Sequence, residues 1–316
     1  MSKQNLILHI GRHKCGTSAL QQYLNRSCQT LISKSICYPI TGRGKKVAHH
    51  ELANLLNPKR GIKANLIIQT KNKFEKEVEN YETIILSSEA FSNIQNTKLV
   101  KEFFSNFQIT TVCYYREILD YFVSAYSQRI QATNYASTFD QFNITTSISY
   151  QTFEDRWVQI SDNYIKRYFH RPYLYNSDIV HDFFQVIKVE LVDNGNFDSV
   201  NKSIGGNLLY SKILINKLEL NHNNLYNKLG KLAQSNKDFS NAFYISKGNA
   251  IKYRKMHRLN NKFLENTYKD IHYKSFINKP LCPNEATLQR DLEFFKTFGL
   301  ISDSAKIWAV HTKFNF

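Results

Sequence analysis

Short apolar runs alternate with segments of helical periodicity through the first 130 residues of the chain. Runs at 6–10, 83–86 and 109–115 are short enough to be buried strands, and a shorter run lies at 34–38. Helical stripes between and after them predict helices at 49–56, 66–80 and 99–107, and from 116 to about 131. Strands that alternate with helices in this way are typical of a parallel sheet in an α/β layer fold.

From residue 139 onward the pattern is mainly helical, with one further strand expected at 164–169. The expected helices are 139–147, 153–161, 178–187, 208–220, 223–235, 249–270 and 284–298. The stretch 192–206 is rich in Asn, Ser and Gly and predicts a loop rather than a linker between domains. We therefore expect a single domain, with an α/β core over 1–190 and a mainly helical extension over 191–316.

The stretch at residues 6–24 is the one around which we expect the rest of the chain to be arranged. The apolar run 6–10 enters a turn bounded by Gly11 and Gly16 and leaves it into a segment with Leu20, Tyr23 and Leu24 on one helical face. A strand, a tight loop and a helix N-terminus form an anion cradle, because the loop and the first helical turn offer unpaired N–H groups. The glycines let the backbone curl closely around a phosphate.

Polar residues end three of the predicted strands. They are the loop residues 11–14, the pair Ser88 and Glu89, and Arg116. Ligands of parallel α/β sheets bind beyond the carboxyl ends of the strands. We therefore expect these three groups to meet at one edge of the sheet.

Charge and cysteine content indicate the class of partner and the cellular compartment to expect. Lys and Arg number 42 against 26 Asp and Glu, a formal net charge of +16, which favours polyanionic partners such as nucleotides, nucleic acid, acidic polysaccharide or an anionic membrane surface. The five cysteines are odd in number and widely spaced, which argues against a disulfide framework and for a reducing compartment. The absence of a signal peptide and of a long apolar run leads us to expect a soluble cytoplasmic protein, with peripheral membrane contact left open.

The glycine-bounded loop differs from a Walker P-loop in the place of its lysine. Gly16 is followed by Thr17, and the lysine stands inside the loop at position 14. The loop resembles the 5′-phosphosulfate loop of sulfotransferases that use 3′-phosphoadenosine 5′-phosphosulfate (PAPS), with the pattern Lys-x-Gly-Thr-Thr/Ser-x-Leu. The matching residues, which the resemblance implies bind the cofactor, are Arg12, His13, Lys14, Cys15, Gly16, Thr17 and Ser18, with Cys15 where Ser, Ala or Gly is commoner.

A second segment carries the same resemblance. Arg116 ends a predicted strand, and Ser124 follows eight positions later on a helix. A guanidinium and a hydroxyl suit a terminal phosphate, because Arg is permanently charged and binds bidentately. The segment resembles the 3′-phosphate-binding segment of the same family, where Arg and Ser have this spacing. The resemblance covers residues 5 to 130 well and implies a P-loop-like three-layer fold.

The resemblance also implies a chemistry. Lys14 would stabilise the bridging oxygen as PAP leaves, and His13 would assist at the sulfuryl group or simply face solvent. No metal is required in the family. The base that receives the acceptor's proton is expected to be Glu89, because glycan-modifying members of the family use a glutamate between the two phosphate segments. His50 is the second candidate, because cytosolic small-molecule members use a histidine there, and an unidentified residue beyond 130 is the third. Otherwise Glu89 is a helix N-terminal carboxylate, and His50 a surface histidine.

Three hypotheses about the function follow from these observations. The first is a PAPS-dependent sulfotransferase acting on a hydroxyl, or an amine, of a glycan or glycolipid, to which the basic charge and the 19 tyrosines lend support. The second is a P-loop kinase or nucleotide hydrolase, against which the place of Lys14 and the lack of a clear Walker B acid argue. The third is a basic nucleic-acid-binding protein, for which no reader motif is present.

Overall fold

The chain forms two compact units in a computed structural model, which describes residues 3–12, 15–191, 204–219, 225–236, 239, 243–277, 283–299, 301 and 304–313. The first unit draws its described residues from the ranges Met1–Arg116, Ser149–Asp198 and Phe263–Asp270. The second draws them from Glu117–Ile148, Ser199–Lys262 and Ile271–Phe316. The expected α/β core therefore lies in the first unit, without the stretch 117–148.

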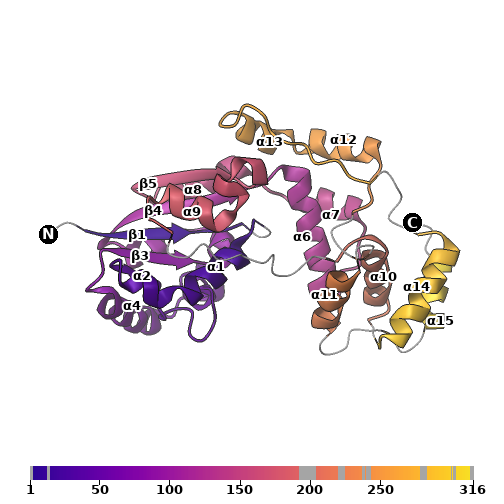
Figure 1. Ribbon diagram of the computed structural model, residues 1–316, viewed down its shortest axis with the longest axis horizontal. Coiled ribbons are helices and arrows are strands. Elements are labelled where there is room, and N and C mark those ends of the chain that lie inside the picture. Colours follow the sequence, from indigo (N-terminus) through magenta and orange to yellow (C-terminus); the bar gives the residue numbers. More distant parts are fainter. Residues whose placement is uncertain are drawn as a thin grey trace. The chain divides into compact units, whose positions relative to one another are not determined.

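A five-stranded parallel sheet forms the centre of the first unit (Figure 1). Its strands are β1 (Gln4–His9), β2 (Ile36–Cys37), β3 (Thr83–Ser87), β4 (Phe107–Tyr115) and β5 (Asn163–Tyr168). Their order across the sheet is β2-β3-β1-β4-β5, with β1 paired in parallel to both β3 and β4. The predicted α/β fold with a parallel sheet is confirmed.

Helices cover both faces of this sheet. The α-helices of the first unit are α1 (Thr17–Arg26), α2 (Cys28–Ile32), α3 (His50–Leu55), α4 (Ala64–Val78), α5 (Lys98–Phe103), α8 (Tyr150–Val158) and α9 (Ile179–Val186). Short 3-10 helices are η1 (Pro58–Arg60), η2 (Glu89–Asn93), η3 (Arg171–Tyr173) and η4 (Tyr175–Ser177). Residues of α1, α2 and α9 form one core cluster with Ile7, Ile85 and Val112. On the other face, Phe74 of α4 contacts Phe103 and Phe107, so the predicted three layers are present.

The register of β1 sets the geometry of the carboxyl edge. His9 lies opposite Ser87 on one side and Val112 on the other. The residues that follow β1, β3 and β4 therefore leave the sheet from neighbouring strands at one edge. The expected convergence of the loop at Gly11, the pair Ser88-Glu89 and Arg116 is confirmed in the arrangement of the backbone.

The second unit is helical in its described residues. Its helices are α6 (Ile118–Ala132), α7 (Phe139–Thr145), α10 (Gly206–Lys217), α11 (Leu225–Ser235), α12 (Lys247–Met256), the first part of α13 (Arg258–Glu265), α14 (Glu285–Thr297) and α15 (Ser304–Lys313). The stripe on α6 that predicts a core face, Leu119, Phe122, Tyr126 and Ile130, is at most 1% exposed. Glu117 caps α6 by accepting bonds from the N–H groups of Leu119 and Asp120.

Two expected helices are corrected. The helix expected at 99–107 ends at Phe103, and Phe107 opens β4. Phe103, Phe104 and Phe107 all contact Phe74. The apolar spacing that predicted a single helix therefore combines the end of α5 with the start of β4. The helix expected at 249–270 is two helices, α12 and α13, because the backbone at His257 leaves helical geometry (φ −107°, ψ 24°). Most of the loop expected at 192–206 lies outside the described residues.

Close packing at Gly11 gives a testable consequence. A Cβ atom there would lie 2.0 Å from the Cγ2 atom of Thr17, far inside contact distance. We expect Gly11→Ala to lower the free energy of unfolding of the first unit by about 1–3 kcal/mol, the usual cost of overpacking. Urea denaturation followed by Trp157 fluorescence measures it, in a Trp308→Phe background because Trp308 belongs to the second unit.

Thr17→Ser supplies the control, since it removes the Cγ2 methyl and keeps the hydroxyl. The stability lost in Gly11→Ala should be partly restored when Thr17→Ser is added to it. The recovery should be incomplete because a Cβ at position 11 would still lie 3.1 Å from His9. Equal losses in the single and double variants would mean that the predicted clash is not the cause.

Candidate active site at the carboxyl edge of the sheet

The loop between β1 and α1 begins and ends on glycines that the packing requires. Gly16 adopts φ 72°, a left-handed conformation, and a Cβ atom on it would lie 2.8 Å from side-chain atoms of Phe169 and Ile179. Gly16 is also the N-cap of α1, which has no side-chain cap bond and no acidic residue in its first turn. The helix N-terminus is thus suited to an anion. His13 and Lys14 lie outside the described residues.

The described side chains of this loop point into the protein. Cys15 is fully buried in the core cluster beneath α1, so only its backbone is placed to contact a ligand. The Arg12 guanidinium lies 4.8 Å from the ring centres of both Tyr150 and Phe153 on α8. Thr17 is buried and Ser18 is exposed, so the hydroxyl of Ser18 is accessible at the start of α1.

Arg116 lies next to the same helix N-terminus. Its guanidinium is 5.7 Å from the ring centre of Phe169, the residue that packs against Gly16. The backbone at this strand end is held by Tyr150, whose hydroxyl donates to the Arg116 carbonyl over 2.8 Å. Arg116 and the end of the loop at Gly16 therefore both lie against Phe169. Ser124, its predicted partner, lies on α6 in the second unit, and the pairing stays a prediction.

The two candidate bases, Glu89 and His50, lie side by side. Nε2 of His50 is 3.7 Å from Oε1 of Glu89, and Nδ1 of His50 is 2.7 Å from the Ser88 hydroxyl. Oε2 of Glu89 accepts a hydrogen bond of 3.0 Å from the side-chain amide of Gln21 on α1. Both side chains keep partial exposure, 21% for Glu89 and 36% for His50. Sequence reasoning treated them as alternatives, and the fold joins them into one pair.

The hydrogen bonds favour one tautomer of His50. The Ser88 hydroxyl oxygen accepts from the N–H of Ala90 over 3.1 Å, and its own proton can be donated to Nδ1 of His50, 2.7 Å away. Nε2 then carries the ring proton and faces Glu89. An ionised carboxylate only accepts hydrogen bonds, so this tautomer avoids placing two lone pairs against each other.

Two neighbouring histidines are buried and held neutral. Burial lowers the pKa of His49 to about 3 and that of His9 to about 4. Nδ1 of His49 accepts from the N–H of Ser87, and its Nε2 lies 2.9 Å from the carbonyl of Pro39. Both ring nitrogens of His49 are therefore used in fixing β3 to the chain after β2. Of the adjacent pair, His50 is the one that reaches the site.

Sequence reasoning missed the residues that support the pair. Gln21, Ser87 and His9 are buried, with Nδ1 of His9 2.7 Å from the Ser87 hydroxyl and the Gln21 amide 3.3 Å from it. A sequence signal existed for Gln21 alone, a polar residue beside the buried stripe Leu20, Tyr23 and Leu24. Ser87 and His9 occupy ordinary strand positions, so only their pairing in the sheet shows their role.

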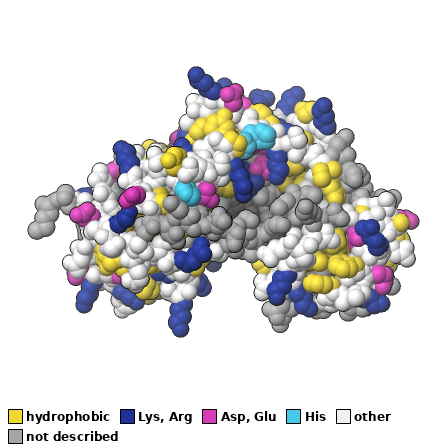
Figure 2. Space-filling view, in the orientation of Figure 1, with side chains coloured by type: hydrophobic (Ala, Val, Ile, Leu, Met, Phe, Trp, Pro, Cys, Tyr) yellow, Lys and Arg dark blue, Asp and Glu magenta, His cyan; other side chains and the backbone are white. Residues whose placement is uncertain are grey.

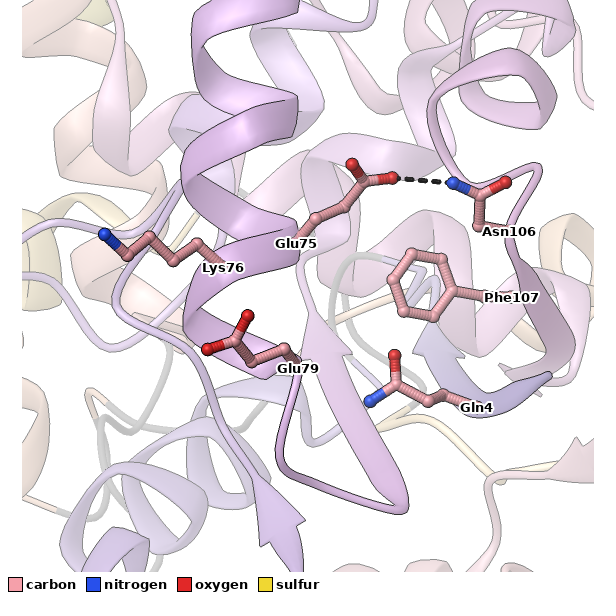
Figure 3. Close-up of a pocket in the computed structure, with 6 residues that line it drawn as sticks. All are labelled: Gln4, Glu75, Lys76, Glu79, Asn106 and Phe107. Carbon is pink, nitrogen blue, oxygen red and sulfur yellow. Dashed lines mark hydrogen bonds between the residues drawn. The ribbon is translucent and has the colours of Figure 1, made fainter. Parts of the chain in front are cut away.

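A separate pocket lies at the opposite edge of the sheet, where β1 and β4 begin (Figure 3). It has a volume of about 530 Å³ and is lined by Gln4, Glu75, Lys76, Glu79, Asn106 and Phe107. Glu75 accepts a bond of 2.9 Å from the Asn106 amide across its rim (Figure 3). The pocket contains none of the predicted site residues.

Charge, metal-ligand groups and membrane spans complete the description. Lys and Arg side chains are spread over the visible surface of the molecule (Figure 2). Within the part of the chain that the structure describes, Cys15, Cys28, Cys37 and Cys113 are free thiols, and no group of three or more His, Cys, Asp and Glu side chains is placed to hold a metal ion. Among the described helices, none combines the length and apolar character needed to cross a membrane.

No protein-family model matches the chain, and no curated protein matches its sequence.

The buried His9 predicts a pH dependence of stability. Its pKa in the folded protein, about 4, lies below the ordinary value of 6.5, so the unfolded chain binds the proton more readily in this range. Stability should fall as the pH drops from about 6.5 to 4, by up to about 3 kcal/mol from this group. His9→Asn, which cannot titrate, should show a shallower fall in urea denaturation across that window. His49 contributes equally to both proteins, so parallel curves would contradict the assignment.

Proposed function

We propose that the protein is a PAPS-dependent sulfotransferase. It moves a sulfuryl group from PAPS to a hydroxyl, or an amine, of a glycan or glycolipid acceptor and releases PAP. The observation that supports this proposal is the meeting of three groups at one sheet edge: the glycine-bounded loop, the Glu89–His50 pair and Arg116. The proposal combines this placement with the resemblance of the loop at Lys14 and the segment at Arg116 to the phosphate-binding segments of that family.

The sheet topology supports the proposed place of the donor. The chain leaves β1 toward β2 on one side of the sheet and leaves β4 toward β5 on the other. Such a point, where connections diverge, is the usual ligand site of open parallel sheets. The 5′-phosphosulfate would lie against the loop and the N-terminus of α1, with Gly16, Thr17 and Ser18 as donors. Arg116 and Ser124 would bind the 3′-phosphate.

The proposed reaction is an in-line displacement at sulfur. The acceptor oxygen forms the new bond to sulfur while the bond between sulfur and the bridging oxygen breaks, and the bridging oxygen keeps the electron pair in PAP. Lys14 stabilises the charge that develops on the bridging oxygen. Glu89 receives the acceptor's proton. His50 has one nitrogen bonded to Ser88 and the other facing Glu89, an arrangement that favours Glu89 as the base and His50 as its partner.

Cofactor selectivity tests the proposal. PAP should bind much more tightly than ADP, since ADP lacks the 3′-phosphate for which Arg116 is proposed. Arg116→Ala should weaken PAP binding about 10- to 150-fold, the range for a charge-assisted hydrogen bond, and leave ADP binding unchanged. Calorimetric titration of both proteins with PAP, ADP and ATP measures this. Equal affinities for PAP and ADP would overturn the proposal, and magnesium-dependent turnover of ATP would favour a kinase or hydrolase.

Lys14→Ala serves as the matched comparison. Its charge is needed most when the bridging oxygen becomes anionic, so this variant should mainly lower turnover, whereas Arg116→Ala should mainly weaken binding. Release of PAP from PAPS, with water or an added acceptor, provides the rate. The opposite pattern would mean that the two residues have exchanged roles or that the loop holds another ligand.

The identity of the base gives a further prediction. Glu89→Gln keeps the shape of the side chain and its contact with Gln21, but it cannot take a proton. Turnover should fall on the order of 10²–10⁴-fold with PAP affinity near wild type. His50→Asn should reduce turnover less, because it removes only the partner of Glu89. A larger loss in His50→Asn than in Glu89→Gln would make His50 the base, and a loss of stability in Glu89→Gln would support a structural role.

A further inference from the structure

Gln21 makes two hydrogen bonds with one side-chain amide. Its Nε2 atom lies 3.0 Å from Oε2 of Glu89 and 3.3 Å from the hydroxyl oxygen of Ser87. The side chain is only 3% exposed. An amide nitrogen has two hydrogens, so it can serve both acceptors at once, and an ionised carboxylate requires that the nitrogen rather than the oxygen face it. The orientation of the amide is therefore determined.

The second acceptor is itself fixed. The Ser87 hydroxyl lies 2.7 Å from Nδ1 of His9, a fully buried residue of the central strand. A chain of hydrogen bonds thus runs from β1 through β3 to α1 and ends on Glu89. Every member before Glu89 is uncharged, because burial keeps His9 neutral. Glu89, the last group in this series of hydrogen bonds, is the only one of the four that is partly exposed.

Gln21 also ties the carboxylate to a particular helix. It lies on α1 five residues after Gly16, the N-cap, which corresponds to a rise of about 7.5 Å along an α-helix. The helix whose N-terminus would hold the donor therefore also holds the carboxylate that would take the acceptor's proton. Displacement of a reacting group by even 1 Å can cost on the order of 10²-fold in rate.

We propose that Gln21 is a positioning residue that holds the Glu89 carboxylate in a fixed place relative to the anion-binding start of α1. This inference rests on the proposed function. The amide fixes the direction of the carboxylate and favours its ionised form, because a hydrogen-bond donor stabilises the charge. The other titratable groups among the described residues that act on Glu89 include His50 on α3, His9 on β1 and Tyr38 after β2.

The test compares Gln21→Met with Gln22→Met. The first variant keeps much of the shape and removes both donors. The second changes the same residue type at the next position of α1, where the side chain is half-buried. The pKa of Glu89 is read from carboxyl ¹³C shifts of glutamate-labelled protein, assigned by their loss in Glu89→Gln. Turnover is read as PAP release from PAPS across pH, and PAP binding by calorimetry.

In Gln21→Met the pKa of Glu89 should rise, and the acidic limb of the turnover profile should move to higher pH. Turnover should fall on the order of 10²-fold with PAP affinity within about twofold of wild type. Gln22→Met should match wild type in all three measurements. Gln21→Glu, which places a like charge beside Glu89, provides a second variant and should raise the pKa of the pair further.

The outcomes separate this inference from the proposed function. If wild-type protein binds PAP but Gln21→Met and Gln21→Glu leave the titration of Glu89 and the turnover profile unchanged, the positioning role is overturned alone. If wild-type protein fails to bind PAP, the proposed function falls and the positioning role falls with it. A uniform loss of turnover with an unshifted titration of Glu89 would mean that Gln21 is only a packing residue, which also overturns the inference.

Discussion

The placement of β1 between β3 and β4 is the constraint on which the rest of the site depends. His9 is in register with Ser87 and Val112 at once, so β1 and β3 end opposite each other, β4 runs on for three more residues to Tyr115, and the residues that follow all three strands share one edge. The loop that follows β1 then leaves the sheet at the point where the chain connections diverge. Glu89 and Arg116 follow different strands and lie 27 positions apart in the sequence, and the order of the strands places both at the same edge of the sheet.

Steric contact then fixes the loop against the sheet. Gly11 approaches Thr17 so closely that no Cβ fits, and Gly16 meets Phe169 and Ile179 in the same way. Together these contacts set where α1 begins. The position of α1 in turn decides that Gln21 reaches Glu89. The geometry of the candidate site is thus specified by the absence of two side chains and the presence of one amide, and the hydrophobic face of α1 keeps the helix in place.

The sequence predicted the sheet and most helices because their periodicity is carried by residues that are in fact buried, such as Leu20 on α1 and Phe122 on α6. It failed where residues of different elements share one cluster, as with Phe103 and Phe107 around Phe74. The candidate bases could be chosen by type and by their place after strands. Their pairing could not, because it depends on where α3 docks relative to β3. Contacts between two elements leave no pattern in the sequence of either element alone.

The environment of the Glu89–His50 pair bears on how a proton would move there. The Gln21 amide donates to Oε2 of Glu89, and Nε2 of His50 lies 3.7 Å from Oε1, so each carboxylate oxygen faces a different neighbour. In the proposed reaction the base must be ionised before the acceptor approaches, and a hydrogen-bond donor such as the Gln21 amide stabilises that form. The separation of 3.7 Å between His50 and Glu89 is longer than a hydrogen bond. The two carboxylate oxygens of Glu89 therefore lie in different surroundings, with Oε2 bonded to the Gln21 amide and Oε1 on the side of His50.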